Sequence, residues 1–308
     1  MTAPTARPRP GARPRRRGTS TGRTRWAGLG FAAPFMIAFT VAIVAPLGYA
    51  FYLSLFQERM VGGTVFVGLD NFTAALTDDR LLSGMRRVGL FLVVQVPVML
   101  VLALVAALAL DSGMLRFAKV FRVGIFVPYA VPAVVASLMW GFIYGDEFGL
   151  AADLRDGLGL PVPDLLGADW LLASIGNVVT WEFVGYNMLI LYTALRAVPS
   201  EIYEAADIDG AGEIRKAVAI KVPALRGALG VALLFSIIGS FQLFNEPNVL
   251  ESLTSSISTY YTPNMYAYNL AFNGQQFNYS AAVAIVLGLA TIAVAYIAQV
   301  ITSRGQRR

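Results

Sequence analysis

Six apolar segments of membrane-spanning length constrain the fold of this chain more than any other feature. A helix needs roughly 20 mostly apolar residues to cross the hydrocarbon core of a bilayer. Of the six segments, only the fourth contains a charged residue, Glu182. The segments are Trp26–Gln57, Val88–Leu110, Val123–Gly145, Leu171–Leu195, Gly227–Asn245 and Tyr279–Ser303. The sequence therefore predicts an all-α integral membrane protein with six transmembrane helices.

Composition agrees with a membrane protein and excludes several kinds of chemistry. Hydrophobic residues make up 56% of the chain and charged residues only 14%, about half the charged share of a soluble domain. The chain has no Cys and no His, which excludes disulfides, thiolate catalysis and the usual zinc or haem ligands. It also lacks the G-x-x-x-x-G-K-[ST] phosphate cradle. We find no convincing catalytic set among the remaining polar residues, so we expect no enzyme activity and no cofactor on this chain.

The distribution of positive charge predicts the orientation in the membrane. The first 25 residues contain eight Arg and no acid, and we interpret residues 1–25 as a disordered cytoplasmic tail. A nucleic-acid-binding arm is the alternative. Most of the other Lys and Arg residues fall on the same side as this tail, as the positive-inside rule requires. We therefore predict a membrane domain over residues 26–303, a short tail over 304–308, and both termini in the cytoplasm.

One charged segment, Tyr203–Pro223 with the sequence YEAADIDGAGEIRKAVAIKVP, interrupts the apolar pattern. Ser200 is a plausible N-cap for a first helix, and Gly210 can adopt the left-handed conformation that ends one. A second helix is predicted over about 212–220. On the predicted topology the segment lies at the cytoplasmic surface. The generic interpretation is an amphipathic connector that rests on the membrane.

The spacing within this segment resembles a family signature. It matches E-A-A-x3-G-x9-I-x-L-P, with Val222 in place of the Leu, which is similar to the signature of permease subunits of ABC importers. Three further stretches, Val127–Tyr144, Leu195–Gly212 and Phe235–Leu250, resemble the carbohydrate-uptake type, and within it the maltose-type first permease subunit. The resemblance covers about residues 27–302. It implies the ABC type I importer permease fold, with a coupling helix that seats in a groove of a separate ATPase.

The resemblance also implies partners and an ATPase-coupling set. The expected partners are a second permease subunit in a heterodimer, two ATP-binding subunits, an extracellular sugar-binding protein and the lipid bilayer of a bacterial plasma membrane. ATP and Mg would be used by the partner ATPase, which would drive alternating access. The residues assigned to ATPase coupling are Glu204, Ala205, Ala206, Asp209, Gly210, Ile220 and Pro223.

Two acids, one inside the fourth span and one at the outer end of the fifth, mark a candidate substrate path, because ionisable groups in a membrane usually face a cavity or a polar partner. Glu182 lies in the middle of the fourth span and Glu246 at the outer end of the fifth. Aromatic and amide side chains accompany both acids, and sugar sites use this mixture. In the maltose-type family the same two helix regions line the sugar site, and Tyr186 takes a sugar-contact position. The predicted substrate-binding residues are Glu182, Phe183, Tyr186, Asn187, Gln242, Phe244, Asn245 and Glu246.

Purely structural roles for these residues are alternatives. The aromatic residues could face lipid or pack against other helices, the amides could bond between helices, and Glu182 could pair with a polar group on a partner subunit. Two other functions also stay open. One is a proton-coupled secondary transporter with Glu182 as the proton-carrying acid. The other is an importer of a glycerol-phosphate-like or other small polar solute, although two acids near the path argue against an anionic substrate.

Overall fold

The computed structural model describes residues 22–59, 61–145, 149–159 and 161–306, and it forms two units that meet between Tyr49 and Ala50. The first unit contains α1 (Gly22–Phe39), the π-helical turn η1 (Thr40–Val44) and the first half of α2 (Ala45–Ser54). Residues 22–25 are helical, so the prediction of a disordered tail is wrong for them. Residues 1–21 lie outside the described residues. At the other end of the chain, residues 304–306 continue the last helix instead of forming a separate tail.

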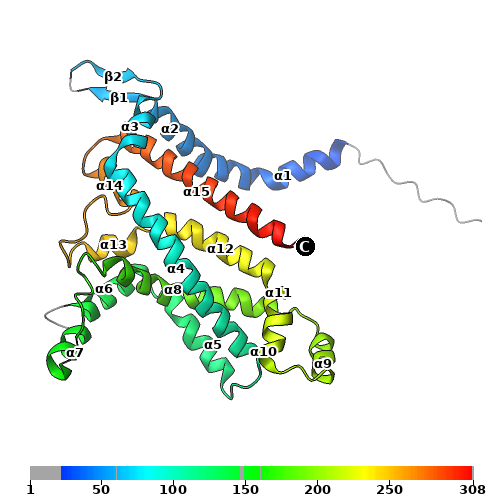
Figure 1. The fold of residues 1–308 in the computed structure, drawn as a ribbon. Helices are drawn as coiled ribbons and strands as arrows, with labels where there is room; N and C mark the ends of the chain where they lie inside the picture. The colour runs from blue at the N-terminus through cyan, green and yellow to red at the C-terminus, as the bar shows by residue number, and fades with distance from the viewer. Residues whose placement is uncertain (1–21, 60, 146–148, 160, 307–308) are drawn as a thin grey trace, which may run out of the picture. The chain divides into compact units, whose positions relative to one another are not determined.

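The second unit is a helical assembly with one small hairpin (Figure 1). Strands β1 (Phe56–Arg59) and β2 (Gly63–Phe66) are antiparallel, with Phe56 opposite Phe66. The long helices are α4 (Asp79–Asp111), α8 (Leu171–Leu195), α12 (Arg226–Phe241) and α15 (Phe277–Gln306). The shorter helices are α3 (Asp70–Thr77), α5 (Ala118–Phe126), η2 (Val127–Ala130), α6 (Ala133–Tyr144), α7 (Leu150–Leu158), α9 (Ser200–Ile208), α10 (Glu213–Lys216), η3 (Ala217–Lys221), α11 (Val222–Ala224), α13 (Asn245–Leu250) and α14 (Pro263–Phe272).

The prediction of apolar spanning helices is confirmed, with one correction. Within the described residues, five helices are long and apolar enough to cross a membrane, or six if one bent pair is counted as a single span. The bent pair is the predicted third span, where α5 with η2 meets α6 at 99°. Pro132 explains this break, because it lacks an N–H group and the residue before it, Val131, is extended with φ −79° and ψ 130°.

The predicted fifth span is also interrupted near its outer end. Helix α12 ends at Phe241, and α13 begins at Asn245. The backbone between them bonds in turns, with the Gln242 N–H donating to the carbonyl groups of Ile238 and Gly239. The break therefore places Gln242, Leu243 and Asn245 beside one another on the wall of a cavity.

Proline also accounts for the two π-helical turns. In each unit a π turn ends two residues before a proline: η1 ends at Val44 before Pro46, and η3 ends at Lys221 before Pro223. Proline cannot donate to the carbonyl four residues earlier and its ring crowds that group. A local shift to wider hydrogen bonding relieves this conflict, and such turns are frequent at functional sites.

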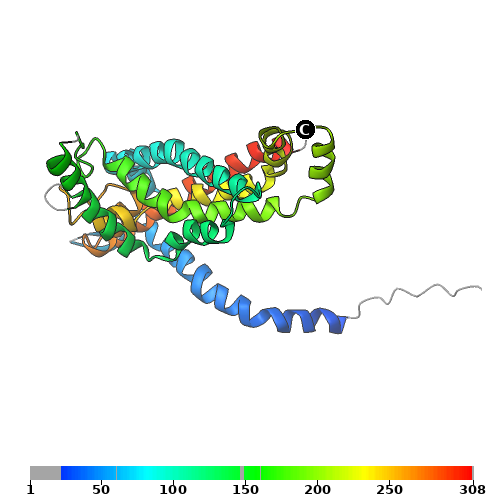
Figure 2. The same cartoon turned by 90° about the horizontal axis from the view of Figure 1, so that it is seen from below.

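Helices α4 and α8 pack along each other and form the centre of the second unit (Figure 2). At one end of this pair, Ala103, Leu110, Leu191 and Leu195 form a buried cluster that Leu225 completes. At the same end lie α9, α10, α11 and the C-terminal end of α15 (Figure 1). The hairpin, α7 and α14 lie at the opposite end. The charged segment and the C-terminal end of α15 are thus on one side of the second unit, which is the arrangement that the predicted topology requires.

Candidate solute cavity and coupling segment

A cavity of about 380 Å³ lies where α4, η2, α8 and the interrupted fifth span converge. Its size is typical of small-ligand sites, which combine apolar walls with a few polar groups. None of the residues described as lining it is Lys or Arg. The polar and aromatic side chains around it are Phe91, Gln95, Tyr129, Phe183, Tyr186, Asn187, Phe235, Ser236, Ser240, Gln242, Asn245 and Glu246.

An aromatic group forms one wall of the cavity. The rings of Tyr129 and Tyr186 are stacked, with centroids 4.9 Å apart and planes 18° from parallel. Phe183 meets Tyr129 edge-on at 5.8 Å. Tyr129 belongs to η2 and lies between Pro128 and Pro132 in the third span. The break in this span therefore places the Tyr129 ring at the cavity wall. The sequence prediction missed Tyr129, although the P-x-x-x-P spacing around it could have indicated a break.

Gly185 makes this arrangement possible. A Cβ atom at position 185 would overlap the backbone carbonyl group of Ile125 and the Cα of Phe126. Because Gly185 has no side chain, the end of α5 can approach α8 to backbone contact. The next residue along α8 is Tyr186, so the close approach sets the distance between its ring and that of Tyr129.

The hydrogen-bond network fixes the orientation of two amides beside the cavity. The Gln95 Nε2 group donates to Thr180 Oγ1 at 3.2 Å, and that hydroxyl donates to the Gly176 carbonyl at 2.7 Å. The Asn187 Nδ2 group donates to the Phe183 carbonyl at 3.0 Å. Since both NH₂ groups serve protein acceptors, Gln95 Oε1 and Asn187 Oδ1 are left as buried acceptors without a partner. Such groups are costly unless a donor satisfies them.

Glu182 and Glu246 add two carboxyl groups to this region. Both are buried, with 3% and 7% of their surface exposed, and Glu246 is on the wall of the cavity. Neither oxygen of Glu182 has a hydrogen-bond partner. Within the described residues there is no cluster of three or more acids that could hold a metal ion. Of the residues that line the cavity, Gln95 and Asn187 each keep an amide oxygen without a partner, and these two acceptors suit a solute rich in hydroxyl donors.

The structure brings together six of the eight predicted substrate-binding residues: Phe183, Tyr186, Asn187, Gln242, Asn245 and Glu246 line the cavity. Glu182 lies behind the wall, not on it. Phe244 turns away and packs on Tyr268, with ring centroids 5.2 Å apart. Sequence reasoning missed the contribution of α4, because the part of it in the predicted second span, Val88–Leu110, is uniformly apolar apart from Gln95. That single amide in the second span was the available signal.

The predicted coupling segment, residues 199–223, has the expected helix–turn–helix form. Helix α9 ends at Ile208, and Gly210 takes a positive φ of 72°, a left-handed conformation that glycine adopts at no steric cost. The second helix comprises α10 and η3. One detail of the prediction is wrong, because Pro199 occupies the N-cap position and Ser200 is the first helical residue, with no side-chain cap.

The residues assigned to coupling separate into surface and interior positions. Glu204, Ala205, Asp209 and Gly210 are exposed, Ile220 and Pro223 are half-buried, and Ala206 is buried at 9% exposure. The prediction missed two large apolar side chains, Ile208 and Ile214, which are 88% and 83% exposed. Both apolar side chains are therefore accessible at the surface of the segment.

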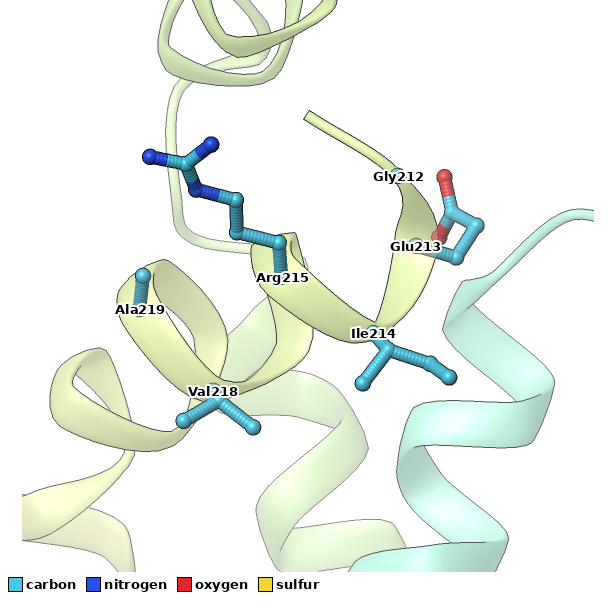
Figure 3. Close-up of a pocket in the computed structure, with 6 residues that line it drawn as sticks. All are labelled: Gly212, Glu213, Ile214, Arg215, Val218 and Ala219. Carbon is cyan, nitrogen blue, oxygen red and sulfur yellow. The ribbon is translucent and has the colours of Figure 1, made fainter. Parts of the chain in front are cut away.

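A shallow depression follows Gly210 in the second helix (Figure 3). Ile214 and Val218 project from one side of it, whereas the Arg215 side chain points elsewhere. The depression is open and lies away from the polar residues of the solute cavity. We therefore interpret it as a surface for protein or lipid, not for the transported solute.

Charge pairs brace the two helices of this segment. Lys216 Nζ lies 2.6 Å from Asp207 Oδ1 and 2.7 Å from Glu213 Oε1. The hydrogen bonds to Asp207 and Glu213 raise the pKa of Lys216. The hydrogen bond from Lys216 in turn lowers the pKa of Glu213. Both side chains are therefore charged at neutral pH, and α9 is held against α10.

A bundle of spanning helices, with a cavity beside broken segments and a charged helix–turn–helix at one end, defines a multi-pass membrane transport component. Residues 99–308 match the family described as binding-protein-dependent transport system inner membrane component. The chain belongs to that family of ABC transporter permeases.

Individual relatives cover most of the chain. A diacetylchitobiose uptake system permease protein of Streptomyces coelicolor is 32% identical over 96% of this chain and 88% of its own length. An arabinooligosaccharides transport system permease protein of Bacillus subtilis is 32% identical over 87% of this chain and 85% of its own. An sn-glycerol-3-phosphate transport system permease protein of Agrobacterium fabrum is 28% identical over 85% and 89%.

The fold is also found in solved structures. A chain from a bacterial ABC transporter involved in the import of the acidic polysaccharide alginate superposes with a TM-score of 0.80. That match has 15% identity and covers 92% of this chain and 96% of the other. The same system in complex with an alginate-bound periplasmic protein gives a TM-score of 0.76 at 17% identity, over 92% and 96% of the two chains. The predicted ABC type I importer permease fold is confirmed.

Proposed function

We propose that this chain is the solute-conducting permease subunit of an ATP-driven importer for an uncharged sugar or oligosaccharide. The observation that carries the proposal is the cavity, in which the Tyr129–Tyr186 aromatic wall faces amide and carboxyl groups. Aromatic faces cover the apolar C–H face of a sugar ring, and buried acceptors receive its hydroxyl groups.

The charge of the cavity favours a neutral solute over an anionic one. Anion sites commonly use Arg or Lys side chains, whereas none of the residues described as lining this cavity is Lys or Arg and Glu246 is on its wall. This is the main argument against a glycerol-phosphate-like substrate. The related permeases serve systems of both kinds by name, so the family alone does not decide between them.

The coupling segment supplies the proposed link to ATP. Its exposed residues include Glu204, Ala205, Ile208 and Ile214, a mixture of charged and apolar side chains of the kind found at protein interfaces. In this proposal two separate ATP-binding subunits use ATP and Mg, and one of them receives α9. A second permease subunit completes the path, and an extracellular binding protein delivers the solute. Both termini and α9 lie in the cytoplasm of a bacterial cell.

Alternating access follows if ATP binds unequally to two states of the complex. A ligand shifts a conformational equilibrium only through its different affinities for the two states. Closure of the ATPase dimer would move the coupling segments and open the cavity outward, and hydrolysis would reset it. Proton-coupled secondary transport is the second candidate, supported by one observation: the buried Glu182 carboxyl has no hydrogen-bond partner.

Ligand screening separates neutral from anionic substrates. The whole complex, with its binding protein, is reconstituted, and ATPase stimulation is measured with neutral oligosaccharides, uronate oligosaccharides and glycerol phosphate. We expect stimulation by neutral sugars. Stimulation by the anions alone would contradict the assignment of the cavity.

A further inference from the structure

A chain of alternating charges runs from the end of α4 to the first helix of the coupling segment. Lys221 Nζ lies 2.8 Å from Asp111 Oδ2 and 3.7 Å from Glu213 Oε2. Glu213 then pairs with Lys216, and Lys216 with Asp207 of α9. The chain thus joins four elements, α4, η3, α10 and α9.

Burial is not uniform along this chain of charges. The side chains of Lys221 and Asp111 are each 5% exposed, whereas those of Glu213 and Asp207 are 43% and 59% exposed. Exposed ion pairs contribute little, but removing one partner of a buried pair leaves an uncompensated charge out of water. In this series of ion pairs, the buried Lys221–Asp111 pair is therefore the one whose disruption costs the most.

Two further contacts hold Lys221 in place. The ring of Tyr203, from α9, lies over the Lys221 ammonium at 5.4 Å. One helical turn later, Leu225 is fully buried in the apolar cluster with Leu110 and Leu195, and the Leu225 N–H donates to the Lys221 carbonyl at 3.0 Å. An ionic contact and an apolar contact thus fix the coupling segment against both central helices.

The helix that carries Asp111 also lines the cavity. Gln95 and Met99 are on α4, which continues without a break to Asp111. Sixteen residues of helix between Gln95 and Asp111 span about 24 Å. A displacement of the coupling segment at Asp111 is therefore transmitted along one helix to the wall of the cavity.

We propose that the Lys221–Asp111 ion pair is the joint through which movement of the coupling segment reaches α4, and that it sets the tightness of coupling between ATP hydrolysis and transport. This inference rests on the proposed function, since it assigns Lys221 and Asp111 as positioning residues for that cycle. Neither Lys221 nor Asp111 occupies a fixed position of the E-A-A-x3-G-x9-I-x-L-P signature, so the role proposed here is additional to that signature.

The test uses the whole complex in vesicles and measures the ratio of sugar transported to ATP hydrolysed. Four variants are compared with the native chain: Lys221→Met, the apolar pair Lys221→Met with Asp111→Leu, the reversed pair Lys221→Asp with Asp111→Lys, and the exposed control Lys119→Met. ATP-dependent uptake by the native complex tests the proposed function independently of any variant.

We expect Lys221→Met and the apolar pair to lower the transport-to-hydrolysis ratio about tenfold while the ATPase still co-purifies. The reversed pair should recover a ratio within about threefold of the native value, and Lys119→Met should leave it unchanged. If the Lys221→Met variant does not assemble with its partner subunits, the transport-to-hydrolysis ratios of the apolar pair and the reversed pair test the proposal. Native coupling in the apolar pair, or no recovery in the reversed pair, would overturn the proposal.

Discussion

Tyr266 of α14 donates a 2.5 Å hydrogen bond to the carboxylate of Asp78, at the start of α4, and Tyr279 donates a second of 2.8 Å to the same oxygen. Asp78 also accepts from the Arg80 N–H and so caps the helix. Burial acts to raise the pKa of Asp78, but the hydrogen bonds outweigh it and lower that pKa below its ordinary 3.8. This carboxylate therefore ties α4, α14 and α15 together at the end opposite the coupling segment.

Asp78→Asn should lower the stability of the purified protein by about 1 kcal/mol at pH 7, because the tyrosines lose a charged acceptor. A depressed pKa contributes stability above the unfolded-state pKa, and this is lost as the pH falls through the folded-state value. The thermal-unfolding gap between native and variant proteins should therefore shrink below about pH 3.8. The exposed neighbour variant Asp79→Asn is the control. A gap that is independent of pH would exclude the ionised carboxylate as the cause.

Ionisation of Tyr266 should end the stabilising effect of the Tyr266–Asp78 hydrogen bond at high pH. Burial and the hydrogen bond to Asp78 raise the pKa of Tyr266 to about 12. Stability that depends on the neutral hydroxyl is complete below the ordinary tyrosine value and declines as the pH rises towards 12. Tyr266→Phe should remove this decline, and unfolding scans from pH 8 to 11 would reveal it.

Tyr129→Ala should reduce sugar uptake about two- to tenfold, because a ring contact of this kind contributes about 0.5–1.5 kcal/mol. Tyr129→Phe keeps the ring and should retain most of the activity. Uptake kinetics of the reconstituted complex provide the measurement, with ATPase co-purification as the check on assembly. Equal losses in both variants would mean that the hydroxyl group, not the ring face, is what matters.

Gly185→Ala should destabilise the chain by about 1–3 kcal/mol, since the added methyl group has no space against the Ile125 backbone. Helix α5 would have to move away from α8, and the Tyr129–Tyr186 stack would loosen. Gly288→Ala is a matched control, because a Cβ atom there meets nothing within 4 Å. If thermal unfolding affected both variants alike, the close approach would not be the reason.

The variants Ala205→Asp and Ala206→Asp should distinguish an effect on ATPase docking from an effect on the folding of this chain. Ala205 is exposed, so its variant should fold normally but lose the ATPase during co-purification. Ala206 is buried in the segment, so its variant should also lower thermal stability. If Ala205→Asp retained the ATPase and native coupling, α9 would not be the docking surface.

Apolar length was sufficient to predict the spans, but not their breaks. The predicted limits of α8 coincide with the observed helix, because this span has clear polar flanks and no proline. The sequence predicts a continuous third span, because hydropathy does not reveal the 99° bend between α5 with η2 and α6. Most of the cavity residues on α8 and α13 could be predicted from their polar character. Phe91 and Met99 could not, because only tertiary packing distinguishes them from lipid-facing residues on α4.

The energy source of uptake tests the proposed function most directly. The complex is reconstituted in vesicles with its binding protein, and uptake of a neutral sugar is measured with ATP supplied and the proton gradient collapsed, and then with the gradient intact and no ATP. We predict uptake in the first condition and none in the second, with Glu182→Gln still dependent on ATP. Uptake that needs no ATP and disappears with the gradient would contradict the importer mechanism and identify Glu182 as a proton carrier.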